Sequence, residues 1–307
     1  MIIIDIKRFR EIFNTIFSSY VFSKFLYSGL RAENVGPQFR FWPSQVIPGT
    51  KEHLYFLTLV AMSDRRTNSE YLYYCFAKMF SKNPTLFRIG FYPTKKRMVE
   101  LFRRYQIALP QKEIDMFLER KRHFDEIFSG DPLLIYKDTS TVEELIQKLE
   151  HIRKKRDLRM IFPGAKKKIF SLLAMYLSEL VKDFNFSDVI PIDTWVMSIC
   201  SQTGCLKGKG IINFDSLGEI IRPQMLSVFN DFRNYQGAAN ATWILGRTLC
   251  KQCSHMNVSS LCPIFNECKG PSSRMRHPES NKHYGRIQLP PKLIGKGKNI
   301  YRLKLLT

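Results

Sequence analysis

Long apolar runs are missing from this 307-residue chain. No segment reaches the roughly 18 apolar residues that a membrane-spanning helix requires. The opening residues, "MIIIDIKRFREIF", interrupt their apolar run with charges too early for a signal peptide. These absences exclude an integral membrane class and predict an intracellular protein, of the cytoplasm or nucleoid, without a membrane partner.

Acidic residues are also scarce. The chain carries 48 Lys and Arg against 27 Asp and Glu, which gives a formal charge of +21. Such an excess favours a polyanionic partner over a small neutral ligand. Nucleic acid is the leading interpretation, and an anionic membrane surface is the second. The apolar content of 44% is that of a globular protein.

The cysteines do not form an even set, which argues against a disulfide framework. Three of the seven are isolated in apolar segments, where burial as small hydrophobes explains them. The other four crowd into "CKQCSHMNVSSLCPIFNEC" with the spacing C-x2-C-x8-C-x5-C; they are Cys250, Cys253, Cys262 and Cys268. This spacing predicts a metal site, and both zinc and a four-iron cluster satisfy it.

Strand-like alternation is rare and helical periodicity is common, so we expect an all-α fold. Gly and Pro residues in "RAENVGPQFRFWPSQVIPGT" predict a boundary near residue 50. The segment "STVEELIQKLEHIRKKR" opens with a predicted capping box that joins Ser140 to Glu143. Residues 271–307 are basic and contain many Pro and Gly residues, which favours a mostly irregular arm.

Three consecutive lysines follow a Pro-Gly turn in "FPGAKKKIF", residues 162–170. Apolar residues that recur every three or four positions predict a helix from about 167 to 184, with Lys168 in its first turn. The helix dipole and the neighbouring lysines both favour the neutral form of the Lys168 amine, which is a nucleophile. The alternative is a solvated basic turn that holds a phosphate.

A single acid, Asp193, stands in "PIDTW", where we expect it to cap the next helix. Capping alone is a sufficient explanation for an acid at this position. A helix over residues 169–184 carries the chain about 24 Å away, and the eight residues that follow return about 26 Å if extended. Lys168 and Asp193 are therefore able to meet, which suggests chemistry on a nucleic-acid sugar.

Four segments in chain order carry a family resemblance: "IGFYPTKKRMV" (89–99), "FPGAKKKIF" (162–170), "IPIDTW" (190–195) and "WILGRTLC" (243–250). The first resembles a G-x-Y-x-x-K helix start, and the second resembles an L-P-G-x-G-x-K hairpin. The third is similar to a V-D-T-H segment with a catalytic acid, and the fourth to a helix that delivers a cluster cysteine. Together they resemble the helix-hairpin-helix DNA glycosylase superfamily, most of all its iron-sulfur branch typified by endonuclease III.

The resemblance implies a two-lobed, all-helical fold, with a six-helix barrel and an iron-sulfur cluster domain. The expected parts are N-terminal helices that join the cluster lobe (1–50), the barrel with the hairpin and catalytic residues (51–200), the cluster lobe (201–270) and the basic arm (271–307). The implied partner is damaged double-stranded DNA, which a monomer binds with the damaged nucleotide flipped out.

The resemblance also implies roles for particular residues. Lys168 corresponds to the nucleophile that forms a Schiff base at C1′, and Asp193 to the acid that supports expulsion of the base. The implied activity is a base-excision repair glycosylase with AP-lyase activity. The implied cofactor is a [4Fe-4S] cluster on the four clustered cysteines, with zinc as the alternative. The alternative functions are an 8-oxoguanine-type or monofunctional glycosylase, or a non-catalytic metal-stabilised DNA-binding module.

Three places are expected to contact DNA. They are the loop "AMSDRRTNSE" with Arg65 and Arg66 as wedge candidates, the helix start with Lys95, Lys96 and Arg97, and the hairpin with Gly164, Lys166 and Lys167. Solvated surface is the alternative for the first two. The chain departs from the family pattern where Lys166 replaces the second hairpin glycine and where Trp195 replaces histidine. A charged insertion, roughly 106–158, separates the first two motifs.

Overall fold

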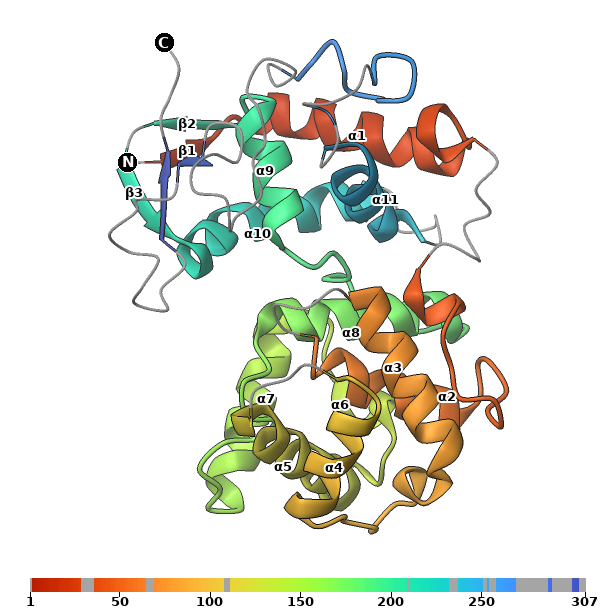
Figure 1. Cartoon of the computed structure of the whole chain (residues 1–307). Helices are drawn as coiled ribbons and strands as arrows, with labels where there is room; N and C mark the ends of the chain where they lie inside the picture. The colour runs from red at the N-terminus through yellow and green to blue at the C-terminus, as the bar shows by residue number, and fades with distance from the viewer. Residues whose placement is uncertain are drawn as a thin grey trace. The chain divides into compact units, whose positions relative to one another are not determined.

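The computed structural model describes residues 2–28, 36–64, 69–107, 111–208, 210–231, 237–250, 253, 258–268, 287–288 and 300–303. Within these ranges the chain is mostly helical, which confirms the prediction from periodicity. Its contacts divide it into a central unit, Glu33–Pro191, and a discontinuous unit, Met1–Ala32 with Ile192–Thr307 (Figure 1). No described helix is both long and apolar enough to cross a membrane.

The units divide near residues 33 and 192, whereas the sequence analysis expected divisions at 50 and 200. The reason lies in local packing. The short 3-10 helix η3 (Pro37–Phe39) contacts α3 (Ser69–Lys82) of the central unit. The helix α9 (Thr194–Gln202) contacts three elements of the discontinuous unit, which are α10 (Phe214–Asp231), α11 (Ala238–Ile244) and the π-helix η5 (Leu245–Cys250).

The helix α2 (Lys51–Ala61) is the innermost element of the central unit. Thr50 caps it by accepting a hydrogen bond from the His53 N–H, and all residues from His53 to Ala61 are buried. Its sequence "LYFLTLVA" is almost wholly apolar, and a helix that is hydrophobic on all sides requires partners all round. Those partners are α3 (Ser69–Lys82), α5 (Gln111–Phe128), α6 (Pro132–Tyr136) and α8 (Lys167–Leu180).

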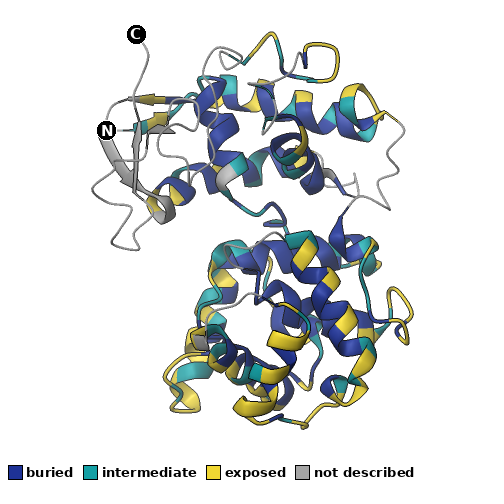
Figure 2. Ribbon diagram, in the orientation of Figure 1, coloured by how far each residue is buried: buried dark blue, intermediate teal, exposed yellow. Residues whose placement is uncertain are grey.

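Aromatic rings fill the core between these helices. Phe56 of α2 contacts Phe80 of α3, and their ring centroids are 5.6 Å apart. Phe76 of α3 contacts Phe117 of α5, with centroids 5.8 Å apart. The helices of the central unit are therefore buried on their inner faces and exposed on their outer faces (Figure 2). The remaining helices of the unit are η4 (Pro84–Phe87), α4 (Lys95–Arg104) and α7 (Val142–Lys155). The expected insertion at 106–158 thus contributes α5, α6 and α7, and α5 contributes to the core.

The discontinuous unit joins the start of the chain to its C-terminal part. The helix α1 (Ile6–Val21) packs on α10 (Phe214–Asp231) and α11 (Ala238–Ile244), and the short helix η1 (Phe25–Tyr27) follows α1. A π-helix, η5 (Leu245–Cys250), continues α11. Asp5 caps α1 by accepting from the Arg8 N–H at 3.0 Å. The inner face of α1 is apolar because Phe9, Phe13 and Phe17 recur every four residues.

Short antiparallel strands also belong to the discontinuous unit, and helical periodicity did not predict them. Strand β1 (Ile2–Ile4) pairs with β2 (Leu206–Gly208), with Ile3 opposite Lys207. Strand β5 (Ile300–Leu303) lies between β3 (Gly210–Asn213) and β4 (Ile287–Gln288). Strands β4 and β5 fall in the segment expected to be a mostly irregular arm; its other residues lie outside those described.

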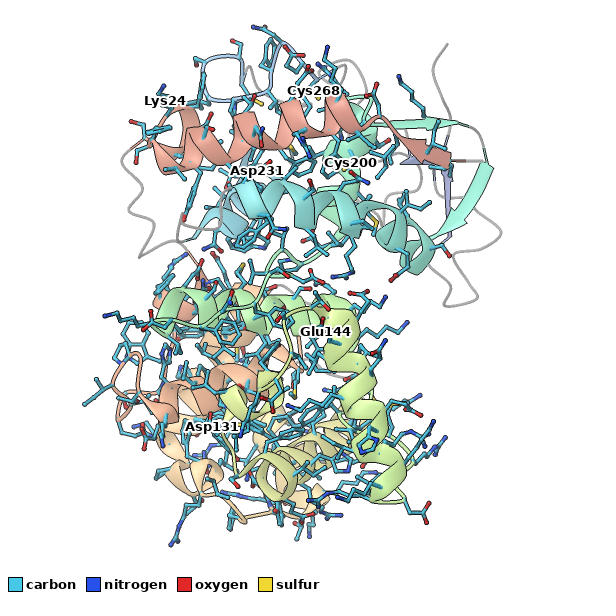
Figure 3. All side chains as sticks on the ribbon, turned by 180° about the vertical axis from the view of Figure 1, so that it is seen from behind. Lys24, Asp131, Glu144, Cys200, Asp231 and Cys268 are labelled. Atoms are coloured by element: carbon cyan, nitrogen blue, oxygen red, sulfur yellow. The ribbon has the colours of Figure 1, made fainter. Side chains whose placement is uncertain are left out.

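Two local predictions need correction. The helix α8 ends at Leu180 rather than near 184, because Val181 adopts an extended conformation and Asp183 has a φ of 64°. The capping box of α7 lies one residue later than predicted, on Thr141 and Glu144 (Figure 3). The Glu144 carboxylate reaches back to the N–H groups of both Ser140 and Thr141, at 2.6 and 3.2 Å.

We predict that His53 makes stability dependent on pH. Burial lowers the pKa of this imidazole from 6.5 to about 4, and the backbone of Gln38 offsets only part of the effect. The folded state therefore disfavours protonation, and this contribution is complete above about pH 6.5 and is lost as pH falls towards 4. The free energy of unfolding should drop on the order of 3 kcal/mol across that window.

Urea unfolding of wild type and of His53→Asn at several pH values between 7 and 4 measures this effect. Asparagine retains an acceptor for the Gly49 N–H, which donates to His53 Nδ1 at 3.0 Å. The variant should therefore show a flatter dependence on pH, whereas parallel curves would contradict the assignment to His53.

Candidate active site and metal centre

The hairpin consists of a tight turn followed directly by α8. Ala165 donates its N–H to the Phe162 carbonyl at 2.9 Å, which closes a four-residue turn. Pro163 occupies its second position, and Gly164, with a φ of 77°, occupies its third. This is the sequence and geometry of a type II turn, in which the third residue requires a positive φ. Gly164 is therefore needed for backbone reasons alone.

Lys166, the residue after the turn, does not strain the backbone. Its φ of −126° and ψ of 177° are extended values that any residue adopts. Lys166 is the N-cap residue of α8, and its side chain makes no capping hydrogen bond. A lysine at this position is thus compatible with the same entry into the helix.

The three lysines have different surroundings. Lys166 is exposed, whereas Lys167 and Lys168 are half-buried. Lys167 Nζ donates to Glu143 Oε1 of α7 at 2.8 Å. Lys168 is the second residue of α8, so its predicted place in the first turn is confirmed. Lys168 also interacts electrostatically with a carboxylate, that of Asp64.

Asp64, which the sequence analysis did not select, is a buried acid just beyond the end of α2. Only 6% of the residue is exposed, and burial raises its pKa, while the charge of Lys168 and a hydrogen bond from Ser69 act in the opposite direction. Ser69 Oγ donates towards the two carboxylate oxygens at 3.0 and 3.2 Å. A carboxylate with a raised pKa beside an amine is suited to accept a proton. Only the tertiary packing of α2 on α8 reveals this neighbour.

Two buried tyrosines extend this polar group. The hydroxyls of Tyr73 and Tyr176 are 2.9 Å apart in a hydrogen bond. Burial is the main cause that raises the pKa of each well above its usual value, and the charge of Asp64 adds to it. Both phenols therefore remain neutral in the core of the central unit.

Asp193 has the capping role expected of it. It is the N-cap residue of α9, and its Oδ1 accepts hydrogen bonds from the N–H groups of Trp195 at 2.8 Å and Val196 at 3.0 Å. The carboxylate is half-buried. Lys168 belongs to the central unit and Asp193 to the discontinuous unit. The meeting of these two side chains therefore remains a prediction.

Trp195 connects the start of α9 to the π-helix that ends at Cys250. A Cβ atom added to Gly246 would come within 2.5 Å of the Trp195 side chain, so only glycine permits this approach. The π-helix itself is a rare conformation that occurs frequently at functional sites. Trp195 therefore packs against the cysteine-bearing helix at a glycine.

The four clustered cysteines line one pocket. Ile199 and Gln202 of α9 and its C-cap residue Thr203 complete the wall, together with Val258 and Ile264 from the cysteine segment. The thiols are those of Cys250, Cys253, Cys262 and Cys268. Burial raises the pKa of Cys250 well above its usual value, and repulsion from the other three thiolates adds to the rise. Burial also raises the pKa of Cys262 to about 11; the backbone of Ile264 acts against the rise, and the charges of Cys268 and Cys253 add to it. All four cysteines line this pocket, and thiolates are metal ligands, so the residues present fit a bound metal whose charge would offset this repulsion.

In their present geometry, the described His, Cys, Asp and Glu side chains include no group of three that holds a metal ion. Cys268 Sγ contacts Gln202 Oε1 of α9 at 3.6 Å (Figure 3). Gln202 is buried and donates its Nε2 to Ser198 Oγ at 3.0 Å. The amide is thus oriented from within α9 beside the last cysteine.

Residues near the start of the chain form hydrogen bonds to the segments around this pocket. Arg8 Nε donates to the Thr203 carbonyl at 3.1 Å, and Arg8 Nη2 donates to the Glu267 carbonyl at 2.7 Å. The same guanidinium forms an ion pair with the Glu267 carboxylate. Leu26 N–H also donates to the Leu261 carbonyl at 2.9 Å. Residues far apart in sequence therefore hold the cysteine segment against α9.

The remaining predicted DNA-binding residues lie on α4 or outside the described ranges. Lys95, Lys96 and Arg97 form the exposed first turn of α4. Lys95 pairs with Asp115 at 2.8 Å and Arg97 with Glu100 at 3.6 Å, and such exposed pairs are weak. Their charges stay accessible to a polyanion. Arg65 and Arg66 lie outside the described residues.

Comparisons of the chain with family models, curated proteins and solved structures find no match. The family resemblance of the four segments therefore remains a prediction. The functional argument therefore depends on four features of the structure, namely the Pro-Gly turn, the lysines after it, the acids Asp64 and Asp193, and the cysteine pocket.

We predict that the capping role of Asp193 is separable from its charge. Asp193→Asn keeps an oxygen that accepts from Trp195 and Val196, so the free energy of unfolding should change by less than about 0.5 kcal/mol. Asp193→Ala removes the acceptor and should cost about 1 kcal/mol. Denaturant unfolding of both variants measures the difference. Equal losses would mean that the charge, not the cap, stabilises α9.

Proposed function

We propose that this protein is a bifunctional DNA glycosylase of the helix-hairpin-helix kind, which removes a damaged base and cleaves the strand through a lysine Schiff base. The single observation that carries the proposal is the placement of Lys168. It stands in the first turn of a helix that follows a type II Pro-Gly turn, and its charge acts on a buried carboxylate, that of Asp64. A merely solvated basic turn does not account for that acid.

The proposed reaction begins with proton transfer from the Lys168 ammonium to a carboxylate, and Asp64 is suited to accept the proton. The neutral amine attacks C1′ of the flipped nucleotide, and the bond between C1′ and the base breaks with its electron pair on the departing base. The nitrogen bonded to C1′ is then positively charged, and it gives a proton to the departing base. The sugar ring opens as the nitrogen lone pair forms the C=N bond, the bond from C1′ to O4′ breaks, and O4′ takes the proton that Asp64 accepted. In the resulting protonated imine, loss of a C2′ proton to the Asp64 carboxylate expels the 3′ phosphate with the electron pair of its C–O bond and cleaves the strand.

Asp193 has a second task in this proposal. Positive charge develops on the sugar as the base departs, and a carboxylate fixed at a helix start stabilises that charge without reorganisation. Two unit charges about 4 Å apart interact by on the order of 4 kcal/mol at an effective dielectric of 20. The hydrogen bonds from Trp195 and Val196 hold the carboxylate in a fixed orientation.

The proposed partner is damaged double-stranded DNA, and the proposed cofactor is a [4Fe-4S] cluster with zinc as the alternative. Cys250, Cys253, Cys262 and Cys268 would hold it, since they line one pocket. When bound, the cluster would cross-link the end of η5, at Cys250, to the three later cysteines, and would not supply a catalytic step. The buried Gln202 would then orient the last ligand.

We predict that Lys168→Gln abolishes covalent trapping of damaged duplex by borohydride, which reduces the imine to a stable amine. Loss of the nucleophile should lower the trapped fraction by more than about 100-fold, while binding of damaged duplex remains. Lys167→Gln is the matched control, because Lys167 already pairs with Glu143.

Asp193→Asn should slow base removal on the order of 100-fold yet retain lyase activity on an abasic site.

Gel analysis of a panel of duplexes, each with a different damaged base, tests these outcomes. Loss of trapping in Lys167→Gln or Lys166→Gln, with trapping intact in Lys168→Gln, would reassign the nucleophile. Full trapping in all three variants would remove the Schiff base from this turn. Binding of every duplex without base release by wild type would favour the non-catalytic DNA-binding module.

We predict that protein purified without oxygen is brown and contains iron and acid-labile sulfide. Cys262→Ser should lower the iron content and the thermal stability together, because the ligand joins the cysteine segment to the rest of the unit. The buried but isolated Cys75 offers a control, and Cys75→Ser should retain the iron. Metal analysis measures both. Stoichiometric zinc without iron would overturn the cluster and leave the zinc alternative.

A further inference from the structure

Arg120 of α5 is a buried cation that contacts the hairpin turn. Only 1% of the residue is exposed, and its Nε donates to the Pro163 carbonyl at 2.7 Å. Its Nη2 donates to Glu113 Oε2 at 3.3 Å, which compensates the charge. Burying a guanidinium is costly unless it is paired and hydrogen-bonded, so the contact with the turn is a specific arrangement. It comes from the segment that the sequence analysis considered an insertion.

A second residue of α5 holds the turn one position earlier. The Phe162 N–H donates to His123 Nδ1 at 3.4 Å, and both groups are buried. Phe162 has a φ of 52°, which a bulky side chain rarely adopts. Two side chains one helical turn apart therefore hold consecutive residues of the turn.

The contact with Pro163 fixes the direction of a neighbouring donor. The Pro163 carbonyl and the Gly164 N–H belong to one planar trans peptide group, so they point in opposite directions. Since the carbonyl points towards Arg120, the N–H points away from α5. Within the described part of the chain this N–H has no hydrogen-bond partner, and Gly164 is half-buried. A flip of this peptide would convert the turn to type I and reverse the donor.

We infer that Arg120 is a positioning residue for DNA binding: it holds the Pro163–Gly164 peptide so that the Gly164 N–H donates to a phosphate oxygen of the DNA backbone. This inference rests on the proposed function, and it adds a role for α5. Arg120 itself touches no phosphate, because its guanidinium is buried against the turn and Glu113. Its effect on binding passes through the turn.

Lys121, the next residue of α5, provides a matched control. It is also only 1% exposed, and its Nζ donates to a backbone carbonyl, that of Arg88, at 3.1 Å. Its acidic partner is Asp125, with Nζ and Oδ2 2.6 Å apart. The two cations thus share a helix, a degree of burial and a pairing pattern. Of the two cations, only Arg120 contacts the hairpin turn. Substitution of either residue should therefore destabilise the core, but only substitution of Arg120 should disturb the turn.

The test compares Arg120→Met with Lys121→Met as full-length proteins, with a damaged duplex as ligand and circular dichroism as the check of folding. Arg120→Met should weaken binding about tenfold, the effect of one lost hydrogen bond to a charged group. Lys121→Met should bind within about twofold of wild type at a similar loss of thermal stability. Arg120→Lys, which keeps one donor, should recover part of the affinity.

The salt dependence separates positioning from direct contact. Loss of a neutral N–H donor releases no fewer counterions, so Arg120→Met should keep the wild-type slope of log K against log salt. Lys166→Gln, which removes an exposed charge, should lower the slope by about 0.9. A slope lowered by the same amount in Arg120→Met would show that Arg120 binds phosphate itself and would overturn the positioning role.

Selective labelling follows the peptide directly. Carbonyl-labelled proline with nitrogen-labelled glycine yields signals only from Pro–Gly peptides, and the sequence contains two, Pro48–Gly49 and Pro163–Gly164. The Gly49 N–H already donates to His53, so it serves as an internal reference. Duplex should shift the Gly164 signal and leave the Gly49 signal in place. This measurement on wild type stands even if Arg120→Met does not fold.

The outcomes distinguish the inference from the function beneath it. If wild type does not bind duplex, the proposed function fails and the inference falls with it. If wild type binds and traps DNA but its Gly164 signal does not move, the proposed function stands and the inference is wrong. Equal losses of affinity in Arg120→Met and Lys121→Met would likewise reduce Arg120 to a core residue.

Discussion

The Pro163–Gly164 turn determines where α8 begins, and the surroundings of the lysines depend on it. Proline fixes one φ and glycine permits the positive φ that follows, so the chain reverses within four residues. The extended Lys166 then starts the helix. A shift of one residue would rotate each side chain about 100° around α8, and Lys168 would no longer face Asp64. The backbone conformation of the turn therefore determines which lysine acts electrostatically on Asp64.

Burial divides the cations of this basic chain into two groups. Arg120 and Lys121 are inside the central unit, where Glu113 and Asp125 compensate them. These charges stabilise the fold and are unavailable to a partner. The exposed group, such as the first turn of α4 and Lys166, retains charges that a polyanion can reach. The number of Lys and Arg residues therefore exceeds the number of positive charges that nucleic acid can reach, because some of these residues are buried in ion pairs.

The cysteine segment depends on elements from both ends of the chain. Arg8 ties the end of α9 to Glu267, and Gly246 allows Trp195 to pack against the π-helix that ends at Cys250. The same α9 is capped by Asp193, and its residues Ile199 and Gln202 line the cysteine pocket. In the proposed function, one helix therefore contributes both to the wall of the cofactor pocket and to the position of the acid.

Local patterns in the sequence determined the helical class, the four crowded cysteines, the first-turn position of Lys168 and the cap formed by Asp193. Each of these depends on periodicity, spacing or a residue next in the chain. Tertiary structure alone decided that Asp64 lies beside Lys168, that Arg120 holds the hairpin and that short strands pair segments far apart in sequence. Sequence patterns record which face of a helix is apolar, but not which other helix covers it. The neighbours that set the charge and orientation of the candidate site follow from that packing.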